Sequence, residues 1–483
     1  GINYFCQRVA MMSWIIFSPE FYFLVVGTVF LCLSMAKRVR PEQVYFIALI
    51  MASIGVGVCL VCVRLSGDLF FGTYRIDLFS QVFKVMLSMG LFLVVCLCTE
   101  LDGIEERFHP EFYFLLTICT LSMMMLVSSV HLLTIFVALE LSSYSLYTLV
   151  FLRKGRDRGV DAGIKYFLIG ASASAMMLFG FALLYGSIQA AFLVEILKIL
   201  PGVIGRPVVI IALILLLSGF LFKLAVFPFH FWAPDVYENA ANQVTTYIAT
   251  ASKVAAIAIL MRIVALSGGG STYLVHILVT LSIVSMTMGN LSAVVQKDLK
   301  RLLAYSSIAH DGYVLIGILS MSPVGYSSAI FYALSLLMMK FTCFLVVVKV
   351  ADDGRNLDIE HLAGLHRRSP ILALALMMAL FGLAGIPPTI GFTGKLMIFT
   401  AAMQKGYFAL VLIAMINVVI SLYYYLLVVK AAYLLEPGKE LPDLKISPSI
   451  KVLAGLLIFG IVAGGIFPNY IVELSRAAAT VLL

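Results

Sequence analysis

Six charged side chains lie within long apolar segments of this 483-residue sequence: Glu140, Lys165, Lys223, Lys253, Lys340 and Lys395. A charge at the centre of a membrane-spanning helix costs roughly 2.5–3.5 kcal/mol on insertion scales. Such residues therefore indicate a polar route through a membrane. Lysine and glutamate can each gain and lose a proton, so these residue types favour a proton as the passenger.

The composition agrees with a membrane location. Hydrophobic residues make up 62% of the chain and charged residues 12%, and the mean hydropathy is +1.07, whereas soluble domains carry about 25% charged residues. Apolar runs of membrane-spanning length recur from end to end, and no long polar stretch leaves room for a soluble catalytic domain. We predict an all-α polytopic membrane protein. The net charge of +8 is spread among loops and does not indicate nucleic-acid binding.

Apolar runs between polar breaks predict about 14 transmembrane helices. The predicted spans are 15–35, 44–63, 79–98, 111–128, 132–152, 162–185, 208–234, 244–265, 273–294, 302–319, 326–350, 370–403, 407–434 and 449–467. The segment 188–200 is too short to span, and its pattern predicts an amphipathic helix at the membrane interface.

Alternate loops carry most of the cations, which predicts the orientation of the chain. These loops hold Lys37, Arg38, Arg40, Arg153, Lys154, Arg156, Arg158, Lys297, Lys300, Arg301, Arg355, Arg367, Arg368, Lys439 and Lys445, against scattered cations such as Arg8, Arg75, Arg206 and Lys405 in the others. By the positive-inside rule, both termini face away from the cytoplasm or matrix. No cleavable signal peptide is evident. We expect a bacterial cytoplasmic membrane, with an organellar inner or thylakoid membrane as the alternative.

Two of the predicted spans are long and interrupted by proline. In span 208–234, Pro228 removes a backbone donor, so we expect a break near 226–229, about one turn after Lys223. In span 370–403, Pro387 and Pro388 predict a second break, and Lys395 opens the second half. The carbonyl groups freed at the C-terminal end of a half-helix favour a cation there.

The two interrupted spans stand five helices apart, which predicts an internal repeat with an ion site near the middle of the membrane. An odd number of helices would invert the second copy. We predict an N-terminal three-helix segment at 1–110, a first repeat at 111–265, a second repeat at 266–434, and a C-terminal helix within 435–483. The alternative is that both breaks are packing kinks, which are common in membrane helices.

Charge alone predicts partners for the charged residues of the first predicted repeat. Burial disfavours an ionised Glu140 unless a cation holds it charged, and Lys223 or Lys253 is the expected partner. Moving a carboxylate toward or away from a buried Lys253 would switch its protonation, as a relay requires. The alternative is a purely structural ion pair. Lys165 lies near the start of its span and could extend its amine to the interface instead.

The second predicted repeat has its own set of ionisable groups. Asp311 is expected to pair with Lys340, and His310 precedes Asp311 in the same span. His310 and His230 suit a proton relay because imidazole titrates near neutral pH, although a hydrogen-bonded structural role is the alternative.

Cysteine usage gives no sign of a cofactor. Cys59 and Cys62 match a C-x-x-C spacing, but they lie inside a predicted span without a second pair, so we interpret them as packed thiols. The sequence contains no haem, iron–sulfur or nucleotide motif, and we predict no metal or cofactor site in this chain.

Four segments resemble subunit N of proton-pumping NADH–quinone oxidoreductase (respiratory complex I), in the antiporter-like family shared with Mrp-type cation/proton antiporters. They are GFLFKLAVFPFHFWAPDVYE, TASKVAAIA, VVQKDLKRLLAYSSIAHDGYVLIG and GIPPTIGFTGKLMIF. The resemblance implies 14 helices with two inverted five-helix repeats. It implies proton-transfer roles for Glu140, Lys223, Lys253 and Lys395, and it matches Lys165 and His230 to family positions. Lys395 and the short C-terminal region favour subunit N over the sister subunits M and L.

Three positions depart from the family pattern. The family has a Gly-x-Pro-x-Pro run where this chain has residues 239–243, a small residue where it has Asp311, and Met-Asn where it has Met339 and Lys340. Asp311 and Lys340 therefore add charges around the second predicted half-channel.

The resemblance implies a subunit that moves protons in response to redox chemistry in other subunits. FMN, iron–sulfur clusters and quinone are expected in those partners, which would include subunit M and the small membrane subunits, together with lipids. One alternative is a subunit of an Mrp-type antiporter. Another is a subunit of a related hydrogenase or of a coenzyme F420- or ferredoxin-driven pump. A structural spacer would gain nothing from charges buried at this cost.

Overall fold

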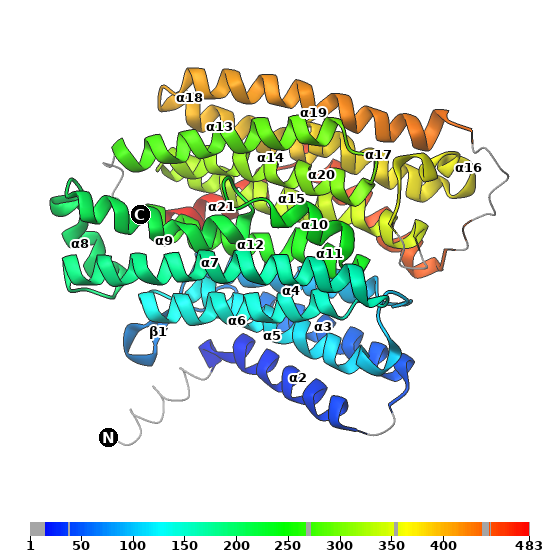
Figure 1. The fold of residues 1–483 in the computed structure, drawn as a ribbon, viewed down its shortest axis with the longest axis horizontal. Coiled ribbons are helices and arrows are strands. Elements are labelled where there is room, and N and C mark those ends of the chain that lie inside the picture. The colour runs from blue at the N-terminus through cyan, green and yellow to red at the C-terminus, as the bar shows by residue number, and fades with distance from the viewer. Residues whose placement is uncertain are drawn as a thin grey trace.

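The fold is a bundle of long helices that lie side by side (Figure 1). The computed structural model describes residues 15–36, 39–266, 272–351, 356–436, 444 and 446–482. Within them, 13 helices are long and apolar enough to cross a membrane. Counting α17 and α18 as the halves of one further crossing gives the predicted fourteen. The prediction of an all-α polytopic membrane protein is confirmed.

Some of the predicted loop cations cannot be placed. Arg8, Lys37, Arg38, Arg355, Lys439 and Lys445, and the side chains of Arg156 and Arg158, lie outside the described residues.

The N-terminal region consists of three helices and a short hairpin. Its elements are α2 (Ser18–Met35), α3 (Pro41–Cys62), β1 (Gly67–Leu69), η1 (Phe70–Gly72), β2 (Tyr74–Ile76) and α4 (Leu78–Cys96). The antiparallel strands place Asp68 opposite Arg75. Strands of three residues are too short to show an alternating pattern in the sequence, which is why the hairpin was not predicted.

The middle of the chain contains the first broken crossing. Its elements are η2 (Glu106–Phe108), α5 (His109–Ser128), α6 (Leu132–Phe151), α7 (Arg156–Ile188), α8 (Leu193–Val203), α9 (Pro207–Leu224), α10 (Trp232–Asn239), α11 (Asn242–Tyr247), η3 (Ile248–Ser252) and α12 (Lys253–Ala265). The short helix α8 corresponds to the predicted interfacial segment 188–200. The π-helical turn η3 interrupts the predicted span 244–265 just before Lys253.

The last part of the chain contains the second broken crossing and a terminal helix that was not predicted. Its elements are α13 (Thr272–Val294), α14 (Leu299–Leu319), α15 (Pro323–Val350), η4 (Ile359–Leu362), α16 (Leu365–Arg368), α17 (Pro370–Ala384), α18 (Ile390–Gln404), α19 (Phe408–Leu434), α20 (Pro448–Ile466) and α21 (Asn469–Thr480). Helix α21 packs against α15 and α4.

Local sequence explains where many of these helices begin. Proline occupies the first turn of α3, α9, α15, α17 and α20, where its missing N–H has no helical partner to lose. Helix α4 begins with a capping box, in which Asp77 accepts from the Ser80 amide at 2.7 Å and the Ser80 hydroxyl accepts from the Asp77 amide at 3.0 Å.

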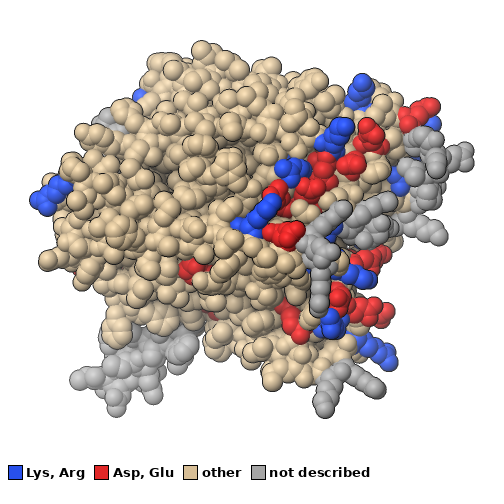
Figure 2. Space-filling view, in the orientation of Figure 1, with Lys and Arg blue, Asp and Glu red and all other residues tan. Residues whose placement is uncertain are grey.

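Burial separates a central group of helices from peripheral helices that expose apolar side chains. The segments Asn242–Ala265 and Leu299–Leu319 are each 94% buried, whereas Pro448–Ile466 is 28% buried and exposes large apolar side chains. Charged side chains gather at the end of the molecule near α10 and α16, and the opposite end near α8 shows few (Figure 2). The buried central helices are the ones that carry Lys253, Asp311 and Lys340.

Candidate functional site

The first helix break leaves a helix end inside the protein. Helix α9 ends at Leu224, and Ala225 adopts a left-handed conformation with φ of 58°. Trp232 at the start of α10 reaches back and donates to the Phe222 carbonyl at 3.0 Å. Lys253 Nζ donates to the Leu224 carbonyl at 2.6 Å. The break predicted near 226–229 is confirmed, and a lysine satisfies a carbonyl that the break frees.

Lys223 lies on the last turn of α9, where its side chain is buried. Its Nζ donates to Ser142 Oγ at 2.8 Å and to Ser143 Oγ at 3.4 Å, and both serines are on α6. Glu140, half a turn earlier on α6, accepts a hydrogen bond from Ser174 of α7. Within the described residues Glu140 has no ion pair within 4 Å, but the charge of Lys223 acts on it. Of the two expected partners, Lys223 is therefore the one that influences Glu140, without direct contact. Lys223 of α9 is instead bonded to α6 through the two serine hydroxyls.

Lys253 forms a buried ion pair with Asp311 of α14. The side chains of Lys253 and Asp311 are 5% and 0% exposed. The expected pair of Asp311 with Lys340 is therefore wrong, because α12 brings Lys253 closer to the carboxylate. The π-helical turn at 248–252 immediately precedes Lys253, and such turns are frequent at functional sites. The ion pair joins the two halves of the chain that were predicted as separate repeats.

Asp311 also lies between Lys253 and a second lysine. Its Oδ1 is buried without a hydrogen-bond partner among the described atoms. Lys340 of α15 is buried, and its charge acts on Asp311, but no described acceptor forms a hydrogen bond or ion pair with its amine. One carboxylate thus faces two lysines and binds only one of them.

His310 precedes Asp311 and is held by two tyrosines. Its Nδ1 lies 2.7 Å from the Tyr332 hydroxyl, and its Nε2 lies 3.0 Å from the Tyr425 hydroxyl. A neutral imidazole donates with one ring nitrogen and accepts with the other, so this geometry suits a group that passes a proton from one side to the other. Lys253, Lys340 and Lys395 are all near enough for their charges to act on His310.

Lys395 occupies the second break in the way that Lys253 occupies the first. Helix α17 ends at Ala384, and Gly385 takes a left-handed φ of 85°. Lys395 Nζ donates to the Leu383 carbonyl at 2.7 Å and to the Ala384 carbonyl at 3.1 Å, and it lies 5.0 Å from the centre of the Tyr313 ring. A cavity of about 440 Å³ between α18 and α19 adjoins this lysine. The predicted second break, with a cation at the end of the half-helix, is confirmed.

The groups described so far form a line of ionisable side chains across the interior: Glu140, Lys223, Lys253, Asp311, Lys340, His310 and Lys395. Lys165 lies apart from this line, and His230 lies beside it at the first break. The Lys165 side chain is 59% exposed and bonds Asp235 at 2.7 Å, which fits the alternative of an amine that extends to the membrane interface. Arg301 bonds the same carboxylate at 2.9 Å. Burial raises the pKa of Asp235, but the hydrogen bonds from Lys165 and Arg301 outweigh it and hold that pKa below its usual range. His230 is buried within the first break, and its Nδ1 has no described partner.

Five buried charged residues were missed in the sequence, namely Glu20, Asp77, Lys84, Arg262 and Lys300. Glu20 and Lys84 form an ion pair of 2.5 Å with neither side chain exposed, and the Tyr74 hydroxyl donates to the same carboxylate at 2.5 Å. Arg262 pairs with Asp77 at 2.8 Å. Lys84 and Arg262 fall inside the predicted spans 79–98 and 244–265, so counting every charge within a span would have found both. Lys300, predicted as a loop cation, is also buried.

The line as a whole contains more cationic than anionic side chains. The lysines at 223, 253, 340 and 395 outnumber the carboxylates at 140 and 311. Holding every one of these groups ionised in a low-dielectric interior would leave uncompensated positive charge, which is costly. Such a line favours states in which some lysines are neutral, and neutral amines can accept protons. The arrangement is chemically suited to passing protons between neighbouring helices.

The fold and this line define an integral membrane protein with ionisable groups across its interior. Residues 129–421 match the family model described as NADH:quinone oxidoreductase/Mrp antiporter, TM, and the chain belongs to this family. It is 62% identical over 472 residues to NADH-quinone oxidoreductase subunit N 2 of Syntrophobacter fumaroxidans, which covers 98% of this chain and 100% of that protein. The predicted resemblance to subunit N is confirmed.

Solved structures agree with the family assignment. A chain of respiratory complex I from Thermus thermophilus with bound aureothin is 32% identical, with a TM-score of 0.81, and the match covers 94% of this chain and 98% of that one. A chain of the Mrp complex from Dietzia sp. DQ12-45-1b is 22% identical, with a TM-score of 0.85, and covers 98% of this chain and 97% of that one. The second likeness shows the fold alone.

Proposed function

We propose that this chain is the proton-translocating membrane-arm subunit of an NADH–quinone oxidoreductase. The observation that carries the proposal is the buried line of ionisable side chains from α6 to α18. The name of the Syntrophobacter relative supports the NADH-driven assignment. In this proposal FMN, iron–sulfur clusters and quinone belong to partner subunits, and this chain contributes no redox group.

The first half of the route runs from Glu140 to Lys253. Redox chemistry in the partner subunits changes the electrostatic field at Glu140 and Lys223. The acceptors of the Lys223 amine are the neutral hydroxyls of Ser142 and Ser143. Since no described carboxylate is bonded to this amine, none holds Lys223 in its protonated state. Lys223 and Lys253 flank the same helix end, since Lys253 donates to the carbonyl of the residue after Lys223. A proton that leaves Lys223 therefore has Lys253 as its next stable position.

The second half of the route begins at Asp311. Its carboxylate compensates a charged Lys253, and its unbonded Oδ1 gives it a second position for an incoming proton or for Lys340. His310 with its two tyrosines offers the continuation through α14. Lys395 is the last lysine of the line and releases the proton toward the positive side of the membrane.

The remaining assignments complete the proposal. Lys165 fixes α7 to α10 at the charged end of the molecule, and His230 serves the route beside the first break. The repeats at 111–265 and 266–434 stay a prediction, supported by the matching roles of Lys253 and Lys395 at the two breaks. The orientation with both termini opposite the cytoplasm, in a bacterial cytoplasmic membrane, is part of the same proposal.

Replacing Lys223 with alanine tests the first half of the route. We expect proton pumping per electron to fall sharply in membrane vesicles, because the position between Glu140 and Lys253 is lost. The exposed Lys198 on α8 provides a matched control, and Lys198→Ala should pump normally. If the Lys223→Ala complex assembles and pumps the normal number of protons per electron, the proposed route is refuted.

The electron donor requires a separate test. Purification from the native membrane in mild detergent, with mass spectrometry of the co-purifying chains, identifies the partners. Flavin and iron–sulfur subunits with nicotinamide-dependent quinone reduction support the proposal. A hydrogenase or an F420-oxidising module keeps the proton route and replaces the donor. Only antiporter-like membrane subunits, without any redox protein, would replace the proposal with an Mrp-type antiporter.

A further inference from the structure

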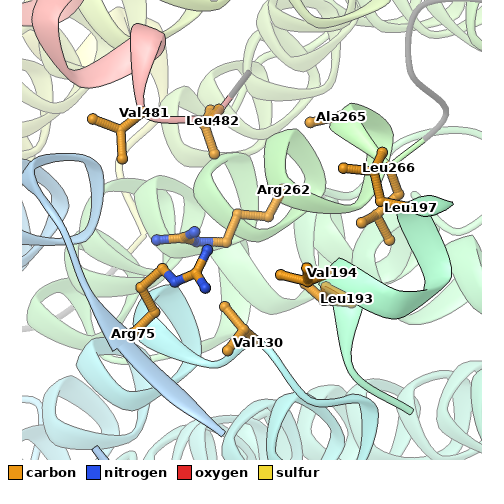
Figure 3. A pocket seen from close by; sticks show the side chains of 10 residues that line it. All are labelled: Arg75, Val130, Leu193, Val194, Leu197, Arg262, Ala265, Leu266, Val481 and Leu482. Atoms are coloured by element: carbon orange, nitrogen blue, oxygen red, sulfur yellow. The ribbon is translucent and has the colours of Figure 1, made fainter. Parts of the chain in front are cut away.

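A second site lies at the end of the molecule opposite the charged face. A cavity of about 80 Å³ opens there, lined by Arg75, Val130, Leu193, Val194, Leu197, Arg262, Ala265, Leu266, Val481 and Leu482. Figure 3 shows the guanidinium groups of Arg75 and Arg262 close together at this pocket, with apolar side chains around them. Two cations in an otherwise apolar pocket, at an end that shows few charges in Figure 2, require an explanation.

Arg262 is buried and rigidly held, but one of its amino groups is unused. Its Nη2 lies 2.8 Å from both carboxylate oxygens of Asp77, its Nε donates to the Val127 carbonyl at 2.9 Å, and its guanidinium lies 4.8 Å from the centre of the Phe79 ring. Nη1 has no hydrogen-bond partner among the described residues. Because its neighbours fix the guanidinium plane, this N–H group points at a fixed position.

Arg75 supplies further donors from the other wall. Its Nε lies 3.1 Å from Asp68 Oδ1 across the hairpin, and within the described residues neither of its Nη groups has a partner. The Arg75–Asp68 pair is 40% and 55% exposed, so the bond between these residues is weak and leaves Arg75 available.

The backbone around the pocket is held in place. Val130 N donates to the Thr73 carbonyl at 3.1 Å, and Leu193 N donates to the Val130 carbonyl at 2.9 Å. The hairpin, the link between α5 and α6, and the start of α8 are therefore joined by hydrogen bonds. The pocket is a built feature of the fold, because its walls come from five segments distant in sequence.

The surroundings specify the chemistry of a ligand. Arginine forks bind phosphate oxygens with paired N–H groups, and here two forks converge on one cavity. Arg262 lies in the last turn of α12 and Arg75 lies just before α4 begins, so both are at the level where spanning helices end. Val194, Leu197 and Val481 are exposed apolar side chains at the rim, suited to contact with acyl chains.

We propose that this pocket binds the phosphate of an anionic phospholipid. The Arg75 Nη groups and Arg262 Nη1 donate to the phosphate oxygens, and the acyl chains lie along the exposed face of α8. The ligand ties the hairpin to α8 and α12. The proposal does not depend on the proton route, because none of these residues belongs to it.

Native mass spectrometry of the full chain in mild detergent tests the site. The probes are dioleoyl phosphatidylglycerol and dioleoyl phosphatidylcholine, added at equal concentrations. We expect one phosphatidylglycerol to be retained in preference to phosphatidylcholine. Arg75→Gln should weaken its retention about tenfold or more, because charge-assisted hydrogen bonds to the phosphate are lost. The exposed Arg64, outside the pocket at the same end, gives a matched control, and Arg64→Gln should bind as the unaltered chain does.

A variant with the opposite effect excludes misfolding as the cause. Asp68→Asn frees Arg75 from its pair and should tighten retention of phosphatidylglycerol several-fold. Equal retention of both lipids, unaffected by Arg75→Gln and Asp68→Asn, would overturn the proposal. Displacement of phosphatidylglycerol by an equal concentration of inorganic phosphate would assign the pocket to free phosphate and overturn the lipid as its source.

Discussion

Replacing Asp311 with asparagine is the sharpest test of the proton route. The substitution preserves the size and shape of the side chain and removes its charge. Lys253 would then keep the Leu224 carbonyl at 2.6 Å as an acceptor and lose its only anionic partner within 4 Å among the described residues. The protonated form of Lys253 becomes less favourable, while the helix end at Leu224 stays satisfied.

The size of the effect follows from the distance and the burial. Two unit charges about 4 Å apart interact with about 4 kcal/mol at an effective dielectric constant of about 20. Lys253 and Asp311 are 5% and 0% exposed, so solvent screens this interaction little. A proton that must rest on Lys253 then meets a barrier higher by up to about 4 kcal/mol, which slows the step by up to about 10³-fold.

The assay measures proton uptake and quinone reduction in the same membrane vesicles. We expect Asp311→Asn to lose most of its proton pumping per electron. The exposed Asp102 gives a matched control, and Asp102→Asn should leave the ratio unchanged. Blue-native gels establish that the complex is assembled, because breaking a buried ion pair also costs about 3–5 kcal/mol of stability. An assembled Asp311→Asn complex with a normal ratio of protons to electrons would refute the role of this pair.

Two further predictions concern ion pairs outside the line. Lys84→Met should lower the thermal stability of the chain in detergent, because it leaves Glu20 buried without its cation at a cost of about 3–5 kcal/mol. Adding Glu20→Gln should recover most of the loss. A double variant as unstable as the single one would show that Lys84 does not stabilise the chain through its pair with Glu20. Asp235→Asn should lose about 1 kcal/mol near neutral pH. Because the folded-state pKa of Asp235 is lowered, its contribution is present above about pH 4 and disappears as the pH falls through the folded-state pKa, so melting curves of the two chains should converge in acid. A gap that stays constant with pH would contradict this assignment.

The membrane-spanning helices and both helix breaks could be predicted because they depend on local sequence, whereas the short hairpin and α21 were missed. Apolar runs set the spans, and Pro228, Pro387 and Pro388 set the breaks. The partners of the charged residues could not be predicted, because pairing depends on how helices pack. Asp311 pairs with Lys253 of α12, although α14 also packs against α15, which carries Lys340. The lipid pocket likewise unites segments near residues 75, 193 and 262, which no sequence pattern connects.

The two broken helices explain how this membrane interior tolerates two of its lysines, Lys253 and Lys395. Each break frees backbone carbonyl groups that have no helical partner, and the negative end of the half-helix dipole favours a cation beside them. Lys253 and Lys395 meet this requirement at Leu224 and at Leu383 and Ala384. A lysine amine retains N–H groups after it loses a proton, so the carbonyls stay bonded in both states. A carboxylate could not donate to them when ionised. Lysine at a helix break is thus suited to repeated protonation, because the change of charge does not leave the backbone unsatisfied.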